Sequence, residues 1–357
     1  MDRNARTKAC AAAAAGALVL AGCSGGTKNA ENAGNTASGQ TSPPVSGAGS
    51  DLERQYERVV DAVLPSVVKI QTDQGEGSGV VFDAQGDIVT NAHVVAGARK
   101  IEVTSSGGGS PANASLVGAF AADDLAVVRV KGGSLKPASW GESGKARVGQ
   151  IVLAMGNPLG LSGSVTNGIV SALHRTVSTK GQGSFQGSTI ADAIQTSADI
   201  NPGNSGGALV TLDGQVIGIP TAAASDPQIG AAAPGIGFAT PSDTVKRIVP
   251  QLIESGKVSN SGRAALGVVV RTIVDPQTGR RSVAVVEVQK GGGAAAAGIR
   301  PGDLILSVNG TATPDQSALT TVLANLKPGD KVKVEIQKSD GSKRQVQVTL
   351  GQLPGGG

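Results

Sequence analysis

Residues 66–240 consist of short runs of β-branched and other apolar residues, and each run is bounded by Gly, Asn or Asp. Regularly spaced short strands with glycine-containing turns are typical of an all-β barrel or sandwich. Because only 2% of the residues are aromatic, the cores must be built from Val, Ile, Leu and Ala. We therefore predict a mostly β fold. The expected strands cover residues 66–70, 79–82, 101–104, 125–130, 150–155 and 215–220.

One serine of this segment lies among glycines, in the run Gly203-Asn204-Ser205-Gly206-Gly207. Glycines adopt backbone conformations that other residues avoid, so N–H groups can converge on one point beside an exposed hydroxyl. An acyl-transfer nucleophile with an oxyanion hole needs this arrangement. The candidate nucleophile is Ser205, and the candidate oxyanion-hole backbone is that of Gly203, Asn204 and Ser205. Ordinary turns and linkers contain similar Gly-Ser-Gly clusters, so the run alone does not establish catalysis.

The order of the ionisable residues separates two kinds of hydrolase. The nucleophile elbow of α/β-hydrolases needs a histidine after the serine. Both histidines, His93 and His174, precede Ser205, so that framework has no base. The remaining order is that of the chymotrypsin-type double barrel, with His93 as base and Asp124 as the acid that fixes its tautomer. Taken singly, His93 could be a core residue and Asp124 a turn residue.

Three segments together resemble the triad segments of the HtrA/DegP/DegS family of serine proteases. They are Thr90-Asn91-Ala92-His93-Val94-Val95, Asp124-Leu125-Ala126-Val127-Val128 and Asn201-Pro202-Gly203-Asn204-Ser205-Gly206-Gly207. Further matches are Gly77-Ser78-Gly79-Val80-Val81, Gly156-Asn157-Pro158-Leu159-Gly160-Leu161, Gly168-Ile169-Val170-Ser171-Ala172 and Gly235-Ile236-Gly237-Phe238-Ala239-Thr240-Pro241. The resemblance implies a protease domain of two six-stranded barrels that meet at a cleft. It selects Asp124 over Asp123 because Asp124 directly precedes Leu-Ala-Val.

The family comparison leaves the specificity pocket open. Asp199 lies six positions before Ser205, where an acid in chymotrypsin-type enzymes selects Arg or Lys. Relatives in the HtrA family usually carry a small apolar residue there, and Ile200 matches the residue that makes their pocket apolar. The two interpretations are a small aliphatic P1 residue and a basic one. His174 is expected on the surface, at the start of a polar loop that runs to residue 188 and that the resemblance identifies as activation-sensing.

Two helical patterns flank the barrels. Leu52, Tyr56, Val59, Val60 and Val63 recur at helical spacing before Pro65. Residues 242–255 are the second pattern, with Ser242 as expected N-cap, Gly256 as stop and Pro250 expected to kink or split the helix. We take the protease domain as residues 51–256.

Residues 257–357 are predicted to form a PDZ domain, a β fold with two helices. The run Ala297-Gly298-Ile299-Arg300-Pro301-Gly302-Asp303 resembles the central signature of bacterial PDZ domains. In such domains a peptide C-terminus adds as a strand, and backbone N–H groups hold its carboxylate. Ala265, Leu266, Gly267 and Val268 match that loop.

The N-terminus reads as a targeting segment. Residues 1–22 combine a basic start with an apolar stretch too short to span a membrane, and Leu20-Ala21-Gly22-Cys23 resembles the bacterial lipobox. The resemblance implies lipidation of Cys23 and anchoring at the extracytoplasmic face of the cell membrane. A plain secretory signal with an incidental cysteine is the alternative. Residues 23–50 are then the lipidated cysteine and a flexible Gly/Ser-rich tether.

Composition narrows the function. The formal net charge is +4 without a basic run, which disfavours nucleic acid binding. With two distant histidines and Cys10 inside the signal, we expect no metal and no cofactor. The resemblance implies an ATP-independent serine endopeptidase that cleaves unfolded or mislocalised proteins, with a PDZ domain that recruits or activates and a homotrimer as assembly. The alternatives are a chaperone or holdase, and a peptide-sensing PDZ adaptor with little proteolysis.

Overall fold

The computed structural model describes residues 48–355, apart from 133–134, 158–162, 180, 182, 186, 202, 227–230 and 275–278. The expected signal peptide, Cys23 and nearly all of the tether lie outside the described residues. Within the described residues, no helix is both long enough and apolar enough to cross a membrane. The described residues belong to one compact unit.

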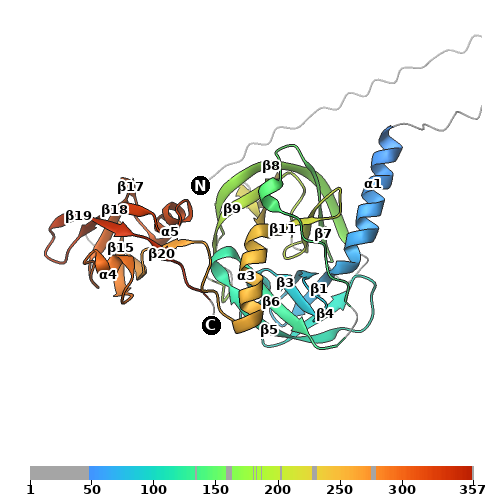
Figure 1. Cartoon of the computed structure of the whole chain (residues 1–357), viewed down its shortest axis with the longest axis horizontal. Coiled ribbons are helices and arrows are strands. Elements are labelled where there is room, and N and C mark those ends of the chain that lie inside the picture. Colours follow the sequence, from blue (N-terminus) through green and yellow to red (C-terminus); the bar gives the residue numbers. More distant parts are fainter. Residues whose placement is uncertain are drawn as a thin grey trace, which may run out of the picture. The chain divides into compact units, whose positions relative to one another are not determined.

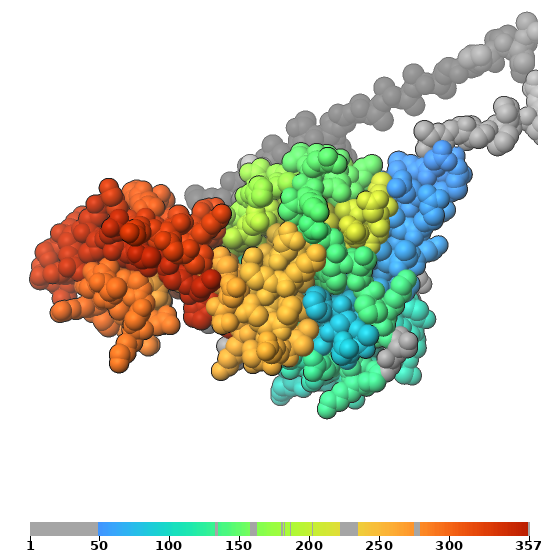
Figure 2. All heavy atoms as spheres, in the orientation of Figure 1, coloured from blue at the N-terminus to red at the C-terminus, as the bar shows by residue number. Residues whose placement is uncertain are grey.

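The first helix, α1 (Ala48–Val63), confirms the helical pattern before Pro65 and begins one turn earlier than expected. Its last turns bury Val59 and Val63 against the barrels, and Pro65 lies in the short helix η1 (Leu64–Ser66) that follows. The first turns of α1, in blue, project away from the barrel strands in Figure 1, and the helix forms one edge of the molecule in Figure 2.

The next six strands close into an antiparallel barrel in the order β1-β2-β3-β6-β5-β4. These strands are β1 (Val67–Thr72), β2 (Glu76–Val81), β3 (Asp87–Thr90), β4 (Ile101–Ser105), β5 (Ala112–Phe120) and β6 (Leu125–Val130). The short helix α2 (Ala92–Val95) follows β3, and the 3-10 turn η2 (Ala121–Asp123) joins β5 to β6.

A second barrel closes in the order β10-β11-β12-β9-β8-β7 after the short helix η3 (Ser143–Lys145). Its strands are β7 (Ile151–Gly156), β8 (Ser164–Ser178), β9 (Thr189–Thr196), β10 (Ala208–Thr211), β11 (Val216–Asp226) and β12 (Ala231–Pro241). Each expected strand is found, with bounds shifted by no more than three residues, except that β11 ends six residues later than predicted. The mostly β double-barrel fold is confirmed.

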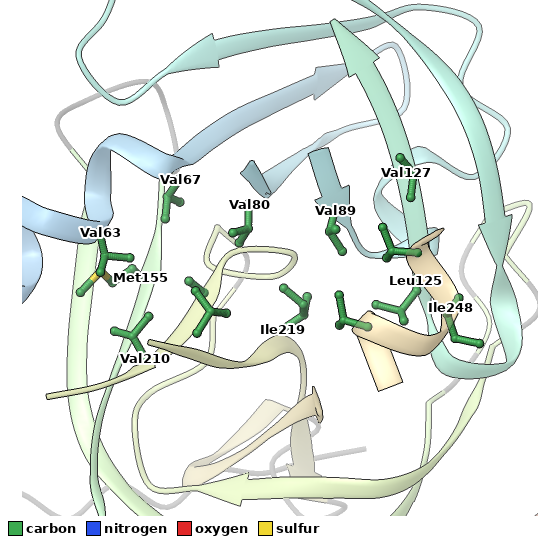
Figure 3. Close-up of a cluster of buried hydrophobic side chains, with 14 of the residues drawn as sticks. Val63, Val67, Val80, Val89, Leu125, Val127, Met155, Val210, Ile219 and Ile248 are labelled. Carbon is green, nitrogen blue, oxygen red and sulfur yellow. The ribbon is translucent and has the colours of Figure 1, made fainter. Parts of the chain in front are cut away.

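Alternating side chains on these strands build separate cores. Outward-facing valines of the first barrel, such as Val67 and Val80, meet Met155, Val210 and Ile219 of the second in one buried cluster between the barrels (Figure 3). The residues that alternate with these along the strands point to the opposite face and form a separate cluster inside each barrel. The two barrels are thus joined by a continuous apolar core, which fixes the positions of the loops at their junction.

Helix α3 (Ser242–Ser255) packs against β5, β6 and β11. One expectation for it was wrong, since Pro241, not Ser242, is the N-cap residue. Of the two effects expected from Pro250, the split is not found, because the helix is continuous through Pro250, whereas a kink stays a prediction. The Ser242 hydroxyl instead donates to the carbonyl of Gly141 and accepts from the N–H of Ser143, so tertiary contacts take the group that was expected to cap. Gly256 ends the helix at φ 69°, as predicted.

The C-terminal part has its own apolar core. Its main sheet has the order β14-β15-β16-β18-β19, with β17 beside β16, and β13 pairs with β20. The elements are β13 (Ala264–Ala265), β14 (Val268–Val274), β15 (Arg281–Val288), α4 (Gly293–Ala296), β16 (Leu304–Val308), β17 (Thr311–Ala312), α5 (Gln316–Ala324), β18 (Lys331–Gln337), β19 (Lys343–Thr349) and β20 (Gly351–Gln352). The β fold with two helices is confirmed, whereas the boundary at residues 256 and 257 stays a prediction.

Candidate active site

His93 is presented by the turn that ends β3. Asn91 has extended backbone angles, φ −77° and ψ 145°, and starts the four-residue helix α2. His93 is the second residue of this helix, between the buried Ala92 and Val94. Because its neighbours are fixed in the first barrel, the half-buried imidazole lies at a defined position on the barrel rim.

Asp124 holds His93 through both carboxylate oxygens. The backbone N–H of His93 donates to Oδ1 over 3.0 Å, and Nδ1 lies 2.7 Å from Oδ2. A carboxylate can only accept, so Nδ1 carries the proton and Nε2 is left with a free lone pair. The carbonyl of Asp124 also accepts from Asn91 Nδ2 and from the N–H of Ala92. This is the tautomer that a general base toward a serine needs.

The turn that carries Ser205 is built around Asn204, which is fully buried. Asn204 Nδ2 donates to the carbonyl of Asp199, and its Oδ1 accepts from the N–H of Asn201. The backbone N–H groups of Gly203 and Ser205 have no acceptor among the residues that the structure describes. Two free N–H groups on one tight turn are the components of an oxyanion hole.

The Ser205 turn is adjacent to the turn that presents His93. Gly206 has φ 82°, and a Cβ there would lie 2.3 Å from the carbonyl oxygen of Ser78 and 2.5 Å from Thr90 Oγ1, so only glycine fits. The N–H of Ser78 donates to the carbonyl of Ser205 over 2.9 Å. Ser205 Oγ makes no hydrogen bond to a described residue, and such contacts often tighten only when substrate binds.

Two hydroxyls that support this arrangement were missed in the sequence. The Thr221 hydroxyl donates to Oδ2 of Asp124 from a position 97 residues away. The Ser78 hydroxyl donates to the carbonyl of Gly203 and accepts from the N–H of Asn157 over 2.8 Å. No local signal marks Thr221, because hydroxyl residues are common in strands; Ser78 lay within a family match but had no assigned role.

The loop after β8 begins later than the sequence analysis predicted. His174 is exposed as expected, but it lies within β8, and the loop begins only after Ser178. This loop carries Phe185, which is 6% exposed and belongs to the core of the first barrel. The Phe185 and His93 rings are tilted by 57° with centroids 5.9 Å apart. An isolated aromatic residue in a Gly/Ser loop was the available signal.

The residues proposed for the specificity pocket have different surroundings. Asp199 is exposed, and its carbonyl accepts from Thr166 Oγ1 and Asn204 Nδ2. Ile200 is buried in the core of the second barrel and packs against Gly237, where the missing side chain leaves room for it. The assignment of both to the S1 pocket stays a prediction.

The proposed carboxylate loop lies beside the free edge strand β14. Ala265 is in β13, Val268 begins β14, and Gly267 between them has φ 78°. The N–H groups of Leu266 and Gly267 have no acceptor among the described residues, while their carbonyls accept from Ala294 and Gln289. Helix α5 contacts β14, so the strand edge, the helix and the loop lie close together, as the predicted peptide site requires.

Two family models match separate parts of the chain. A model of the trypsin-like peptidase domain matches residues 77–219, and a model of the PDZ domain matches residues 264–350. The chain is similar to Serine protease PepD of Mycobacterium tuberculosis, with 44% identity over 83% of this chain and 66% of PepD. It is similar to the Probable periplasmic serine endoprotease DegP-like of Chlamydia trachomatis, with 37% identity over 80% of this chain and 55% of that protein.

Among solved structures, the HtrA-type protease AlgW with decapeptide aligns with a TM-score of 0.55 and 31% identity. That alignment covers 84% of this chain and 99% of AlgW. By contrast, the chain spans no more than about two thirds of the two curated relatives' own length.

Proposed function

The chain belongs to the HtrA family of serine proteases, and we propose that it acts as a serine endopeptidase with Ser205 as nucleophile, His93 as general base and Asp124 as the acid that orients His93. The observation that carries this proposal is the 2.7 Å contact from His93 Nδ1 to Asp124 Oδ2, beside the turn that presents Ser205. That contact leaves Nε2 free to take a proton.

In the proposed reaction, Ser205 Oγ attacks the scissile carbonyl carbon while its proton passes to His93 Nε2. The N–H groups of Gly203 and Ser205 stabilise the negative oxygen of the tetrahedral intermediate. His93 then gives the proton to the leaving amine, and a water molecule hydrolyses the acyl-enzyme with His93 again as base. Asp124 stabilises the imidazolium throughout.

A fluorophosphonate probe tests the proposal directly, because it reacts only with an activated serine. Labelling of the intact protein followed by peptide mapping should place the adduct on Ser205. An adduct on another serine, or none with or without a peptide activator, would contradict the assignment.

The substrates that we propose are unfolded or mislocalised proteins outside the cytoplasm. A relative named as a periplasmic endoprotease supports this location.

We further propose that the mature chain starts at a lipidated Cys23 and fractionates with membranes. Mapping the mature N-terminus to another residue would refute this proposal. A homotrimer stays a prediction, which the mass of the intact protein in solution tests.

For specificity, we predict cleavage after Val, Ala, Ile or Leu. Asp199 is exposed, so its carboxylate can stay in water and need not enter an apolar pocket, where an unpaired charge would be costly. Profiling of cleavage sites in an unfolded substrate should give the same apolar pattern for the wild type and Asp199→Ala. Asp213→Ala removes another exposed acid of the second barrel and is the matched control. Basic P1 residues that disappear only in Asp199→Ala would overturn this prediction.

The PDZ groove is proposed to sense peptide C-termini and to activate cleavage. Support comes from α5, which contacts β8 and β9, with Thr176 Oγ1 donating to Asn325 Oδ1 over 2.9 Å at the end of the helix. Strands β8 and β9 flank the loop that carries Phe185 beside His93. A peptide against α5 is thus linked through packed elements to the triad.

We expect peptides with a free, apolar C-terminus to raise cleavage of a separate substrate by roughly five- to a hundredfold, the usual range of such coupling. The same peptide with an amidated C-terminus should act much more weakly, since it lacks the carboxylate that Leu266 and Gly267 would capture. The measurement is activity of the full-length protein against peptide concentration. Equal activation by both peptides, or binding without activation, would show that the groove does not regulate in this way.

A further inference from the structure

The two chain segments that flank the PDZ core run together beside the protease barrels. Val258 and Gly355 exchange backbone hydrogen bonds, with N to O distances of 2.6 and 3.0 Å. The N–H of Leu353 donates to the carbonyl of Arg263 over 2.7 Å, and Ser261 Oγ donates to the carbonyl of Leu353 over 2.7 Å. We call residues 258–263 and 353–355 the clasp.

Arg263 of the clasp reaches into the turn that precedes the candidate acid. Its Nη1 donates to the carbonyl of Ala122, to Asp123 Oδ1 and to the carbonyl of Thr189, over 2.9, 2.7 and 2.6 Å. Arg263 and Asp123 are both almost fully buried. Burial raises the pKa of the Asp123 carboxyl, and the neighbouring guanidinium opposes that rise. Separating such a buried pair would leave an uncompensated charge in the protein interior, which is strongly destabilising. The pair therefore holds η2 and the start of β9 against the clasp.

The other half of the clasp closes on the opposite end of the same turn. Phe120, which is 1% exposed, is the residue from which η2 starts. Gly355 is seated so tightly on its ring that a Cβ would lie 2.2 Å from both Cδ2 and Cε2. Leu353 and Val258 belong to the same core cluster as Phe120. The clasp therefore contacts Phe120, which directly precedes η2, and the last two residues of η2.

Asp124 follows directly and has φ 52° and ψ 44°, the left-handed region that residues other than glycine rarely adopt. Such a conformation persists only where the surroundings hold it. We propose that the clasp is a positioning device for the catalytic acid, which keeps Asp124 in the conformation that reaches His93. This inference rests on the proposed function, in which Asp124 is the acid of the triad.

The test is Gly355→Ala in the full-length protein, because the added methyl group cannot fit against Phe120. Small displacements of catalytic groups cost much activity, so we expect kcat to fall by roughly ten- to a hundredfold with KM unchanged. The far-downfield proton resonance of the His93 Nδ1–H bond should weaken. Gly351→Ala is the matched control, since its nearest atom would be 4.0 Å away, and it should behave as the wild type.

Two further variants keep the test decisive. Phe120→Leu combined with Gly355→Ala makes room for the methyl group and should recover most of kcat. A chain that ends at Gln352 lacks the tail and should show the same loss of kcat if Gly355→Ala does not fold. Wild-type kcat in Gly355→Ala and in the chain that ends at Gln352, or a raised KM at unchanged kcat in either, would overturn the proposal. A wild type that fluorophosphonate does not label would instead refute the proposed function.

Discussion

Replacing Ser205 by alanine is expected to lower kcat for peptide cleavage by about a million-fold, the loss that follows when a serine-protease triad loses its nucleophile. Ser205 Oγ has no hydrogen bond to a described residue, and the contact from the Ser78 N–H to the Ser205 carbonyl stays in place. The fold and PDZ binding should therefore be unchanged. Cleavage of a peptide and of an unfolded protein, together with a thermal melt, measures both expectations.

His93→Ala should cost nearly as much, and the double variant little more, because the two residues act as a unit. His174→Ala is the matched control, since His174 is exposed and pairs with Asp192 away from the triad. Appreciable proteolysis by purified Ser205→Ala would show that another residue is the nucleophile. A wild type that prevents aggregation of unfolded proteins but neither cleaves them nor reacts with a fluorophosphonate would favour the chaperone alternative.

Asp124→Asn is expected to lower kcat by about ten-thousandfold, as the equivalent change does in a trypsin-type protease. Oδ2 of Asp124 accepts from His93 Nδ1 and from Thr221, and Oδ1 accepts from the His93 backbone. An amide supplies only one accepting oxygen. If that oxygen satisfies the backbone N–H, the amide NH₂ faces Nδ1 and moves the ring proton to Nε2, which can then no longer take the serine proton.

The control for this variant is Asp192→Asn, which alters the exposed His174–Asp192 contact and should leave kcat unchanged. Steady-state kinetics at several pH values measure both variants. Activity of Asp124→Asn within about tenfold of the wild type would mean that no carboxylate at this position is needed for catalysis.

Features with a short-range cause were readable from the sequence. The strands follow from runs of β-branched residues between turn residues, and the left-handed end of α3 follows from Gly256. The turn around Ser205 needs glycine at Gly206 because the backbones of neighbouring segments approach closely there. Each of these features requires a particular residue type at a particular position, so it can be predicted from the sequence alone.

Predictions from local sequence failed where a side chain makes a hydrogen bond to a distant residue or is buried against a distant part of the fold. Ser242 could have capped α3, but the backbone of residues 141 and 143 takes its hydroxyl. The loop after β8 has the composition of a mobile segment, yet Phe185 is buried against the first barrel. In both cases a tertiary contact outweighed the local preference.

The sequence by itself determined the short β strands, which depend on residue types within a few positions, and the order of the candidate triad, which is read directly along the chain; the two barrels were expected only from the family resemblance. Only the tertiary structure decided which distant groups hold that triad. Thr221 reaches Asp124 across 97 residues, and Arg263 reaches Asp123 across 140. Such pairs form only once the strands close and the tail returns to the barrels. Closure brings together groups whose separation along the chain carries no signal, and burial then gives their hydrogen bonds an energy that they would lack in water.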